Sequence, residues 1–250
     1  MKNSQFRKKE NLFVVEGVKE VNAAIDSGFK HEMFYICRDI FLDEALEKKI
    51  RRLENSENQI IYEVSKAVYE SIAYRESSQG IIATFHSKTN KIEDLKLSAH
   101  PLVIVLESVE KPGNLGAVLR TADASGADAV IVCDPLVDIY NPNVVRSSVG
   151  CIFFQQIAVT NTADAIKWLK SKGIKIFATA LPATKMYYNF NFKKSSAIVM
   201  GSEANGLSKE WFDNADELIK IPMLGKTDSL NVSTSAAIVV FEVVRQRSVK

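Results

Sequence analysis

The stretch "GKTDSLNVSTSAAIVVFEVVRQ", residues 225–246, changes character halfway along. Residues 229–235 are small and polar, whereas residues 236–244 are apolar on nearly every side of the helix that they would form. A helix that is apolar all round must be buried in a core or at an interface. Small side chains at its start let another body come close, such as a cofactor, a loop or a second subunit. An ordinary packed C-terminal helix is the alternative.

Two residues at the start of this helix suit a binding site. Ser229 is predicted to be the N-cap, which leaves backbone amides free to face a ligand. Asn231 has a side chain that orients a donor and an acceptor at once. Both residues also suit a plain helix start, so the spacing alone leaves the two interpretations open.

The composition is typical of a globular protein with a sizeable core. The 250 residues are 46% hydrophobic and 25% charged, and the net charge of +2 creates no global field for nucleic acid, although a local basic patch would be enough. No apolar run reaches about 18 residues and the N-terminal residues lack the apolar segment of a signal, so we expect a cytoplasmic protein that does not cross a membrane. Three widely spaced cysteines, Cys37, Cys133 and Cys151, predict reduced thiols and no metal site.

The chain is predicted to form two α/β domains. Residues 1–90 alternate helix-like and strand-like segments, as in a small α/β domain. Residues 91–100 lie in a polar stretch that ends at Pro101, and they form the predicted linker. In residues 101–250, strands alternate with helices, beginning with the apolar run "LVIVLES", so we expect a mostly parallel sheet with helices on both faces. Ligands of such sheets bind at the carboxyl ends of strands. The strand ends of interest are Ala180, Met200 and Met223.

A glycine-containing segment, "ESVEKPGNLGAVLRTADASGAD", follows the first of these strands. On a helix from Asn114, the apolar residues fall at core spacing and Arg120 lies on the opposite side, facing solvent, a partner or a ligand. Gly113 and Gly116 bracket the turn and permit close backbone approach, and the free amides can bind a phosphate. Asn114 also suits a helix cap, and Arg120 also suits a plain surface charge. The predicted core stripe consists of Leu115, Val118, Leu119 and Ala122.

The same segment also has the outline of a dinucleotide site. A strand, a glycine-containing turn, a helix and a second strand ending in Asp134 follow one another. The turn supplies two glycines rather than the spaced three of that motif, so this signal is weak.

A second segment, "VMGSEANGLSKEW", places Gly201 and Glu203 after another buried strand. Gly201 permits close backbone contact with a ligand, and Glu203 can accept hydrogen bonds or a proton. A surface-loop glutamate is the alternative.

Two further stretches suit RNA. The segment "TKMYYNFNFKK", residues 184–194, interleaves aromatic residues with lysines, which either stack on exposed bases or anchor the loop. The N-terminal stretch is basic and would contact an RNA backbone unless it is a solvated end. Its basic residues are Lys2, Arg7, Lys8 and Lys9.

Taken in order, four motifs resemble the SpoU (TrmH) family of RNA ribose methyltransferases within the SPOUT superfamily. The motifs are "PGNLGAVLRTADASGAD", "NPNVVRSSVG", "GSEANGLS" and "IPMLGKTDSLNVSTSAAIVVFE", which span residues 111–242 in the family's order. Residues 1–90, with "RKKENLFVVEGVKEV" and "SSQGIIATF", resemble more loosely the RNA substrate-recognition domain of many such enzymes. Ala204 stands where the family often has glycine and Ser235 where it often has alanine, so each departure exchanges one small residue for another.

The resemblance implies a catalytic domain that ends in a deep trefoil knot, an exception to the rule that chains are unknotted. It implies S-adenosyl-L-methionine as the cofactor and a homodimer through the C-terminal domain, with the active site beside the interface. Residues 229–235 would then be small because they face the cofactor, and residues 236–244 would pack in the knot and against the partner. By similarity, the cofactor contacts would be Thr179, Ala180, Gly201, Ile221, Met223, Ser229 and Leu230.

The implied reaction is methyl transfer to a ribose 2′-hydroxyl. A sulfonium is already a strong electrophile, so the protein must mainly align the groups and help the hydroxyl lose its proton. By similarity, the catalytic residues would be Arg120, Asn114, Glu203 and Asn231, with Glu203 a candidate proton acceptor. A guanidinium is a very poor base, so we expect Arg120 to hold a phosphate and to stabilise the alkoxide. Arg146 and Ser148 match a further family motif and would contact RNA.

Members with the added domain tend to modify ribosomal RNA, so we expect rRNA rather than tRNA as the substrate. Two other classes stay open: a nicotinamide-dependent oxidoreductase and a non-catalytic RNA-binding protein that kept the fold. The presence of all four catalytic candidates argues against lost activity.

Overall fold

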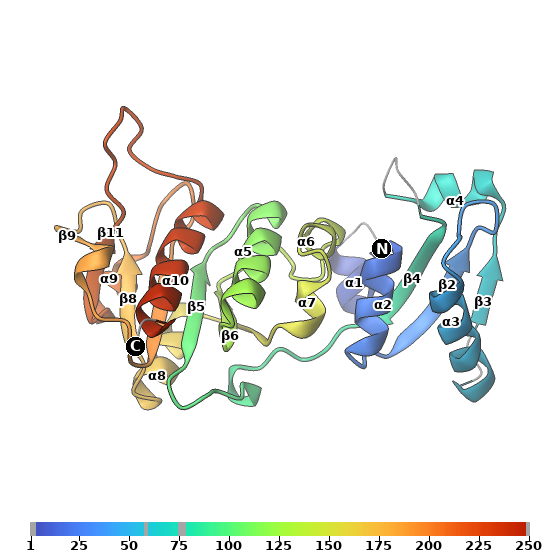
Figure 1. The fold of residues 1–250 in the computed structure, drawn as a ribbon, viewed down its shortest axis with the longest axis horizontal. Helices are drawn as coiled ribbons and strands as arrows, with labels where there is room; N and C mark the ends of the chain where they lie inside the picture. Colours follow the sequence, from blue (N-terminus) through green and yellow to red (C-terminus); the bar gives the residue numbers. More distant parts are fainter. Residues whose placement is uncertain (1–3, 58–59, 75–78, 249–250) are drawn as a thin grey trace. The chain divides into compact units, whose positions relative to one another are not determined.

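The computed structural model describes residues 4–57, 60–74 and 79–248, and the chain forms two compact units (Figure 1). Unit 1 consists of Met1–Thr89 and Ile139–Phe154, and unit 2 of Asn90–Asp138 and Gln155–Lys250. Lys2 and the two serines of "SSQGIIATF" lie outside the described residues.

Unit 1 is built on a four-stranded sheet with the order β1-β4-β2-β3. The strands are β1 (Leu12–Glu16), β2 (His31–Ile36), β3 (Ile60–Glu63) and β4 (Ile81–His86). β4 is antiparallel to both of its neighbours, and β2 and β3 are parallel. The helices are α1 (Ser4–Glu10), α2 (Val18–Asp26), α3 (Glu44–Glu57) and α4 (Lys66–Ile72). These elements agree with the small α/β domain that the sequence predicts.

Two short helices from later in the chain complete unit 1. They are α6 (Pro142–Ser147) and α7 (Cys151–Phe154). The ring of Tyr140 stacks on Phe13 at 4.5 Å between centroids, and Phe153 meets Phe29 edge-on at 5.2 Å. The sequence predicts residues 139–154 as part of the second domain. They pack with the first because their aromatic side chains share one core with β1 and the segment after α2.

Unit 2 contains a seven-stranded sheet with the order β7-β6-β5-β10-β8-β11-β9, in which every pairing is parallel. The strands are β5 (Leu102–Glu107), β6 (Ala129–Cys133), β7 (Ile157–Thr160), β8 (Lys175–Thr179), β9 (Lys185–Met186), β10 (Ser196–Met200) and β11 (Glu217–Lys220). The parallel α/β prediction is therefore confirmed. The sequence does not predict β9, because its two residues are too few to leave a pattern.

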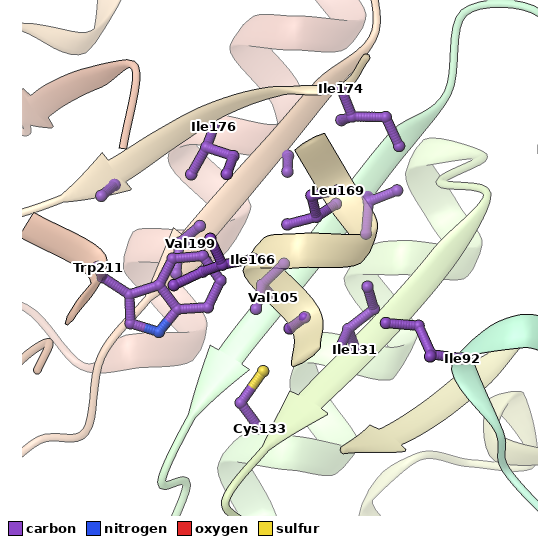
Figure 2. Packing of buried hydrophobic residues seen from close by; sticks show 14 of the residues in the cluster. Ile92, Val105, Ile131, Cys133, Ile166, Leu169, Ile174, Ile176, Val199 and Trp211 are labelled. Carbon is purple, nitrogen blue, oxygen red and sulfur yellow. The ribbon is translucent and has the colours of Figure 1, made fainter. Parts of the chain in front are cut away.

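Helices cover both faces of this sheet (Figure 1). α5 (Pro112–Ser125) and α10 (Val232–Ser248) pack against each other on one face, and α8 (Thr162–Ser171) and α9 (Lys209–Asn214) on the other. Figure 2 shows alternate strand residues such as Val105, Ile131 and Val199 facing α8, with the indole of Trp211 beside them. Since successive strand residues point to opposite faces, the intervening apolar residues face α5 and α10. The central strands β5, β6 and β10 are thus buried on both sides, as their continuous apolar sequences predict.

The predicted linker, residues 91–100, is in fact part of unit 2. Ile92, in the 3-10 turn η1 (Ile92–Asp94), is 5% exposed and belongs to the core shown in Figure 2. The Lys96 amide donates to Gln156 Oε1 at 2.8 Å and the Ser98 amide to Asp128 Oδ1 at 2.6 Å. Side chains of unit 2 therefore hold the backbone of this stretch, which is not a free linker.

The aromatic loop after β8 mainly anchors itself to the core. Phe192 is fully buried and its ring lies 4.6 Å from that of Phe177, between centroids. Gln246 of α10 accepts from the Phe192 amide at 2.9 Å and donates to the Phe190 carbonyl at 2.9 Å. The prediction that this loop stacks on exposed bases is therefore wrong for Phe192. Tyr188 is 50% exposed, so for its ring base stacking stays a prediction.

None of the helices that the structure describes is both long and apolar enough to cross a membrane.

Phe153 and Phe154 give a matched test of the aromatic core. Phe153 is 5% exposed and Phe154 is 58% exposed. Phe153→Ala should lower the free energy of unfolding by about 3–5 kcal/mol because it empties a packed site, whereas Phe154→Ala should change it by less than about 1 kcal/mol. Urea unfolding of both variants measures the difference. Equal losses would contradict the assignment of residues 139–154 to this core.

Candidate active site

The loop after β10 folds back tightly on itself. Ser202 and Gly206 form a bridge with hydrogen bonds of 3.0 Å in both directions, and Gly206 has a left-handed φ of 65°. A Cβ atom at position 201 would overlap the Gly206 carbonyl carbon and the Leu207 amide. The close packing of this loop therefore requires a glycine at position 201, whether or not a ligand also approaches it.

The helix α5 brings Asn114 to this loop. α5 begins at Pro112 with Lys111 as its N-cap, so Asn114 lies in the first turn and is not the cap that the sequence suggested. Its side chain is 8% exposed and donates through Nδ2 to Glu203 Oε1. Gly113 and Gly116 are likewise inside the helix rather than bracketing a turn.

Asn231 joins the same network from the start of α10. Its Nδ2 donates to Asn114 Oδ1 at 3.0 Å, and its own Oδ1 accepts from the Ser233 amide at 3.0 Å. Asn231 therefore caps α10, and the prediction that Ser229 is the cap is wrong. Ser229 is exposed and its hydroxyl donates to Asp228 Oδ1 at 3.1 Å. Three of the four predicted catalytic residues thus form one hydrogen-bonded chain.

A cavity of about 910 Å³ lies beside this chain at the carboxyl ends of β8, β10 and β11. Its walls are the segments that follow these three strands, as expected for a parallel sheet. All seven residues predicted as cofactor contacts line it, together with Glu203 and Asn231. These seven residues are Thr179, Ala180, Gly201, Ile221, Met223, Ser229 and Leu230.

The cavity is large enough for a ligand of drug size. Apolar side chains around it are left open to solvent: Leu181 is 67% exposed, Leu224 96% and Leu230 39%. The Thr179 hydroxyl already donates to the Val199 carbonyl at 2.8 Å. Thr179 therefore offers a ligand mainly its backbone groups.

Sequence reasoning missed several residues of this cavity. Most of them lie in the segments between β8 and β9 and between β11 and α10, so the carboxyl ends of β8 and β11 are the signal that could have found them. They include Lys111, Leu181, Pro182, Met186, Leu224 and Asp228. Lys111 and Asp228 add one charge of each sign to the walls.

Arg120 is not part of the cavity wall. The core stripe of α5 is confirmed, since its four apolar residues are fully buried, and Arg120 is exposed, as the helix geometry predicted. Within the described residues, its guanidinium makes no ion pair or hydrogen bond.

The other predicted RNA contacts lie in unit 1. Arg146 and the lysines Lys8 and Lys9 are exposed. Ser148 is fully buried and its hydroxyl donates to the Val145 carbonyl at 2.8 Å, so the expected RNA contact of Ser148 is wrong. Arg7 is 3% exposed and is equally unsuited to contact a phosphate.

Cys133, the last residue of β6, and Asp134, which follows it, have structural roles. Asp134 Oδ2 accepts from the Thr162 amide at 2.9 Å. This hydrogen bond already uses the carboxylate that would have to bind the ribose in a dinucleotide site. Cys133 is buried and burial raises the pKa of its thiol, an effect that the nearby carboxylates of Asp134 and Glu107 increase. Cys133 is thus a neutral core residue rather than a nucleophile. Over the described ranges, no group of three or more His, Cys, Asp or Glu side chains is placed to hold a metal.

Comparisons with known proteins assign the class. Residues 101–241 match the SpoU rRNA Methylase family, and residues 1–83 match the MRM3-like substrate binding domain. The chain therefore belongs to the SpoU rRNA methylase family.

Similar proteins cover nearly the whole chain. The 23S rRNA (guanosine(2553)-2′-O)-methyltransferase RlmP of Bacillus subtilis is 29% identical, over 94% of this chain and 89% of its own. The 23S rRNA (guanosine-2′-O-)-methyltransferase RlmB of Vibrio parahaemolyticus is 38% identical, over 75% of this chain and 78% of its own. The crystal structure of an AdoMet-bound rRNA methyltransferase from Sinorhizobium meliloti superposes with a TM-score of 0.89 and 29% identity, over 98% of this chain and 91% of that chain.

Gly201 and Gly225 give a matched test of the loop geometry. Gly201→Ala should lower the free energy of unfolding by about 1–3 kcal/mol or more, because the new methyl group meets backbone that cannot move aside. Gly225→Ala should be neutral, since a Cβ at that position meets nothing within 4 Å. Thermal unfolding of the two variants measures the change in stability that each substitution causes. A neutral Gly201→Ala would contradict the close packing of this loop.

Proposed function

We propose that the protein is an S-adenosyl-L-methionine-dependent RNA methyltransferase that methylates a ribose 2′-hydroxyl in ribosomal RNA. The single observation that carries this proposal is the hydrogen-bonded chain of Glu203, Asn114 and Asn231 at the wall of a ligand-sized cavity, in a member of the SpoU rRNA methylase family. The named activities of the relatives and the AdoMet-bound structural neighbour support it.

The cavity suits the chemistry of S-adenosyl-L-methionine. Apolar walls such as Ile221, Met223 and Leu230 match an adenine ring, and the backbone of the three loops offers donors and acceptors for its polar edge. The carboxylate of Asp228 provides the opposite charge for an ammonium or sulfonium group. When bound, the cofactor supplies an electrophilic methyl group.

Glu203 is the proton acceptor in this proposal. The 2′-oxygen would take the methyl group as the bond between that methyl group and the cofactor sulfur breaks. The hydroxyl must lose its proton in this step, and a carboxylate within hydrogen-bond reach can receive it. Asn114 fixes the orientation of that carboxylate, and Asn231 fixes the orientation of Asn114. Since a carboxylate that is already oriented needs no rearrangement during the reaction, the chain of hydrogen bonds contributes preorganisation.

Arg120 contributes charge rather than basicity. A guanidinium stays protonated and binds phosphate in a bidentate manner. Because Arg120 is exposed and has no partner within the described ranges, it is available to hold the RNA phosphate beside the target ribose and to stabilise the developing alkoxide. Lys8, Lys9 and Arg146 offer further cationic contacts from unit 1, whose match to a substrate-binding domain supports a role in RNA recognition.

The proposal includes a homodimer, a trefoil knot and a cytoplasmic location. α10 buries Ala236, Val239 and Val240 in its own unit, whereas Phe241 on another side is 46% exposed, which supports a partner subunit on that side. The knot rests on the family resemblance and is compatible with the tight 201–207 loop and the packing of α10 against α5. The free cysteines suit a reducing compartment.

Arg120→Ala tests the proposed function most simply. Methyl transfer from radiolabelled cofactor to rRNA should fall at least about 100-fold because charge stabilisation at the oxygen is lost, while cofactor affinity by calorimetry should stay unchanged. Asp123→Ala, an exposed change on the same helix, is the control and should leave both values unchanged. Wild-type protein that binds rRNA but transfers no methyl group would instead favour a non-catalytic RNA-binding protein.

Phe241→Glu tests the proposed dimer. A charge at the centre of an apolar interface is expensive to bury, so the variant should run as a monomer in light scattering while the wild type runs as a dimer. Ala163→Glu adds the same charge on α8, on the other face of the sheet, and should leave the dimer intact. A monomeric, active wild type would contradict the interface.

A further inference from the structure

Glu107, the last residue of β5, is a buried carboxylate with no part in the reaction described above. Glu107 is only 5% exposed. Oε1 accepts from the Thr162 hydroxyl at 3.0 Å, and Oε2 accepts from the Ser208 amide at 2.7 Å. A buried charged group is stable only when it is hydrogen-bonded, so both contacts are needed. Glu107 thereby joins two segments that lie 55 and 101 residues further along the chain.

Ser208 stands at the end of the loop that carries Glu203. The beginning of this loop is fixed by β10 and by the close contact of Gly201 with Gly206. At the other end, Leu207 packs its side chain in the core, and the Ser208 amide is held by Glu107. The far end of this cavity wall therefore depends on a side chain from a neighbouring strand.

The two contacts of Glu107 are not equivalent. Thr162 is held a second time, since its backbone amide donates to Asp134 Oδ2 at 2.9 Å. The Ser208 amide has the Glu107 carboxylate as its acceptor. Loss of the carboxylate would therefore leave Thr162 and the start of α8 in place, but it would remove the acceptor of the Ser208 amide at the end of the Glu203 loop.

We propose that Glu107 is a positioning residue for methyl transfer: through Ser208 it holds the 201–208 loop in the geometry that Glu203 and the cofactor cavity require. The inference rests on the proposed function, because it takes the cavity as the S-adenosyl-L-methionine site. Glu107 is not among the described residues that line the cavity, so its effect is transmitted by the loop backbone.

Two substitutions of similar length separate the hydrogen bond from the volume of the side chain. Glu107→Met fills the same space but offers the Ser208 amide no good acceptor, so the Kd for the cofactor should rise about tenfold or more and kcat should fall. Glu107→Gln keeps a carbonyl oxygen for Ser208 and can donate its amide to the Thr162 hydroxyl, so both values should stay within about threefold of wild type. If Glu107→Met is too unstable to assay, Glu107→Asp carries the same prediction, because its shorter side chain cannot reach both partners.

Thr162→Val is the structural control. It removes the other hydrogen bond of the same carboxylate while leaving the Ser208 contact and the Asp134 contact in place. Tm should fall, whereas the Kd for the cofactor and kcat should match wild type. Trp211 lies three residues after Ser208 and is fully buried, so its fluorescence reports on this end of the loop. The Trp168→Phe substitution removes the other tryptophan. In that background, the emission of Trp211 should shift to the red in Glu107→Met and should stay unchanged in Thr162→Val.

Three results would overturn the inference. Glu107→Met with wild-type Kd and kcat would show that the loop does not need this anchor. Equal losses in Thr162→Val and Glu107→Met would show a general structural role instead of positioning through Ser208. A wild-type protein that binds no S-adenosyl-L-methionine would refute the proposed function itself, and this inference with it; that result is distinguishable because it appears before any variant is compared.

Discussion

The carboxamide of Asn114 is the interaction on which the site depends. Its two ends pair with Glu203 and Asn231, which lie 89 and 117 residues away along the chain. An amide can satisfy a carboxylate with its donor and a second amide with its acceptor, so one side chain orients two others. Through it, the start of α5, the loop after β10 and the start of α10 are held as one constellation. Each of these segments also borders the cavity or carries a residue that does.

The parallel sheet explains why these segments meet. β8, β10 and β11 are neighbours in unit 2, so the loops at their carboxyl ends share one edge. Gly201 then lets the loop after β10 close on itself, and the cavity occupies the remaining space between the three loops. The order of the strands thus brings the three loops together, and the side chains on these loops then provide the groups for the reaction.

The sequence predicted the fold of unit 2 for physical reasons, whereas most of the residues around its cavity were named by the family resemblance. Continuous apolar strands and helix-period stripes report burial directly, and small residues report close approach. Local patterns failed where the answer depends on tertiary contacts. Tyr140 and Phe153 complete the core of unit 1 although they flank the motif "NPNVVRSSVG" of the predicted catalytic domain, and nothing near them in the sequence shows this. Ser148 matches a motif, yet its hydroxyl donates to the Val145 carbonyl inside the core.

A crystal structure with S-adenosyl-L-methionine bound tests the central claim most directly. The account predicts the cofactor in the cavity between residues 179–182, 201–207 and 221–231, with its methyl group directed toward the side of the cavity that carries Glu203. A cofactor bound elsewhere, or a cavity closed by Leu181, Leu224 and Leu230 while the protein still transfers methyl groups, would contradict the account.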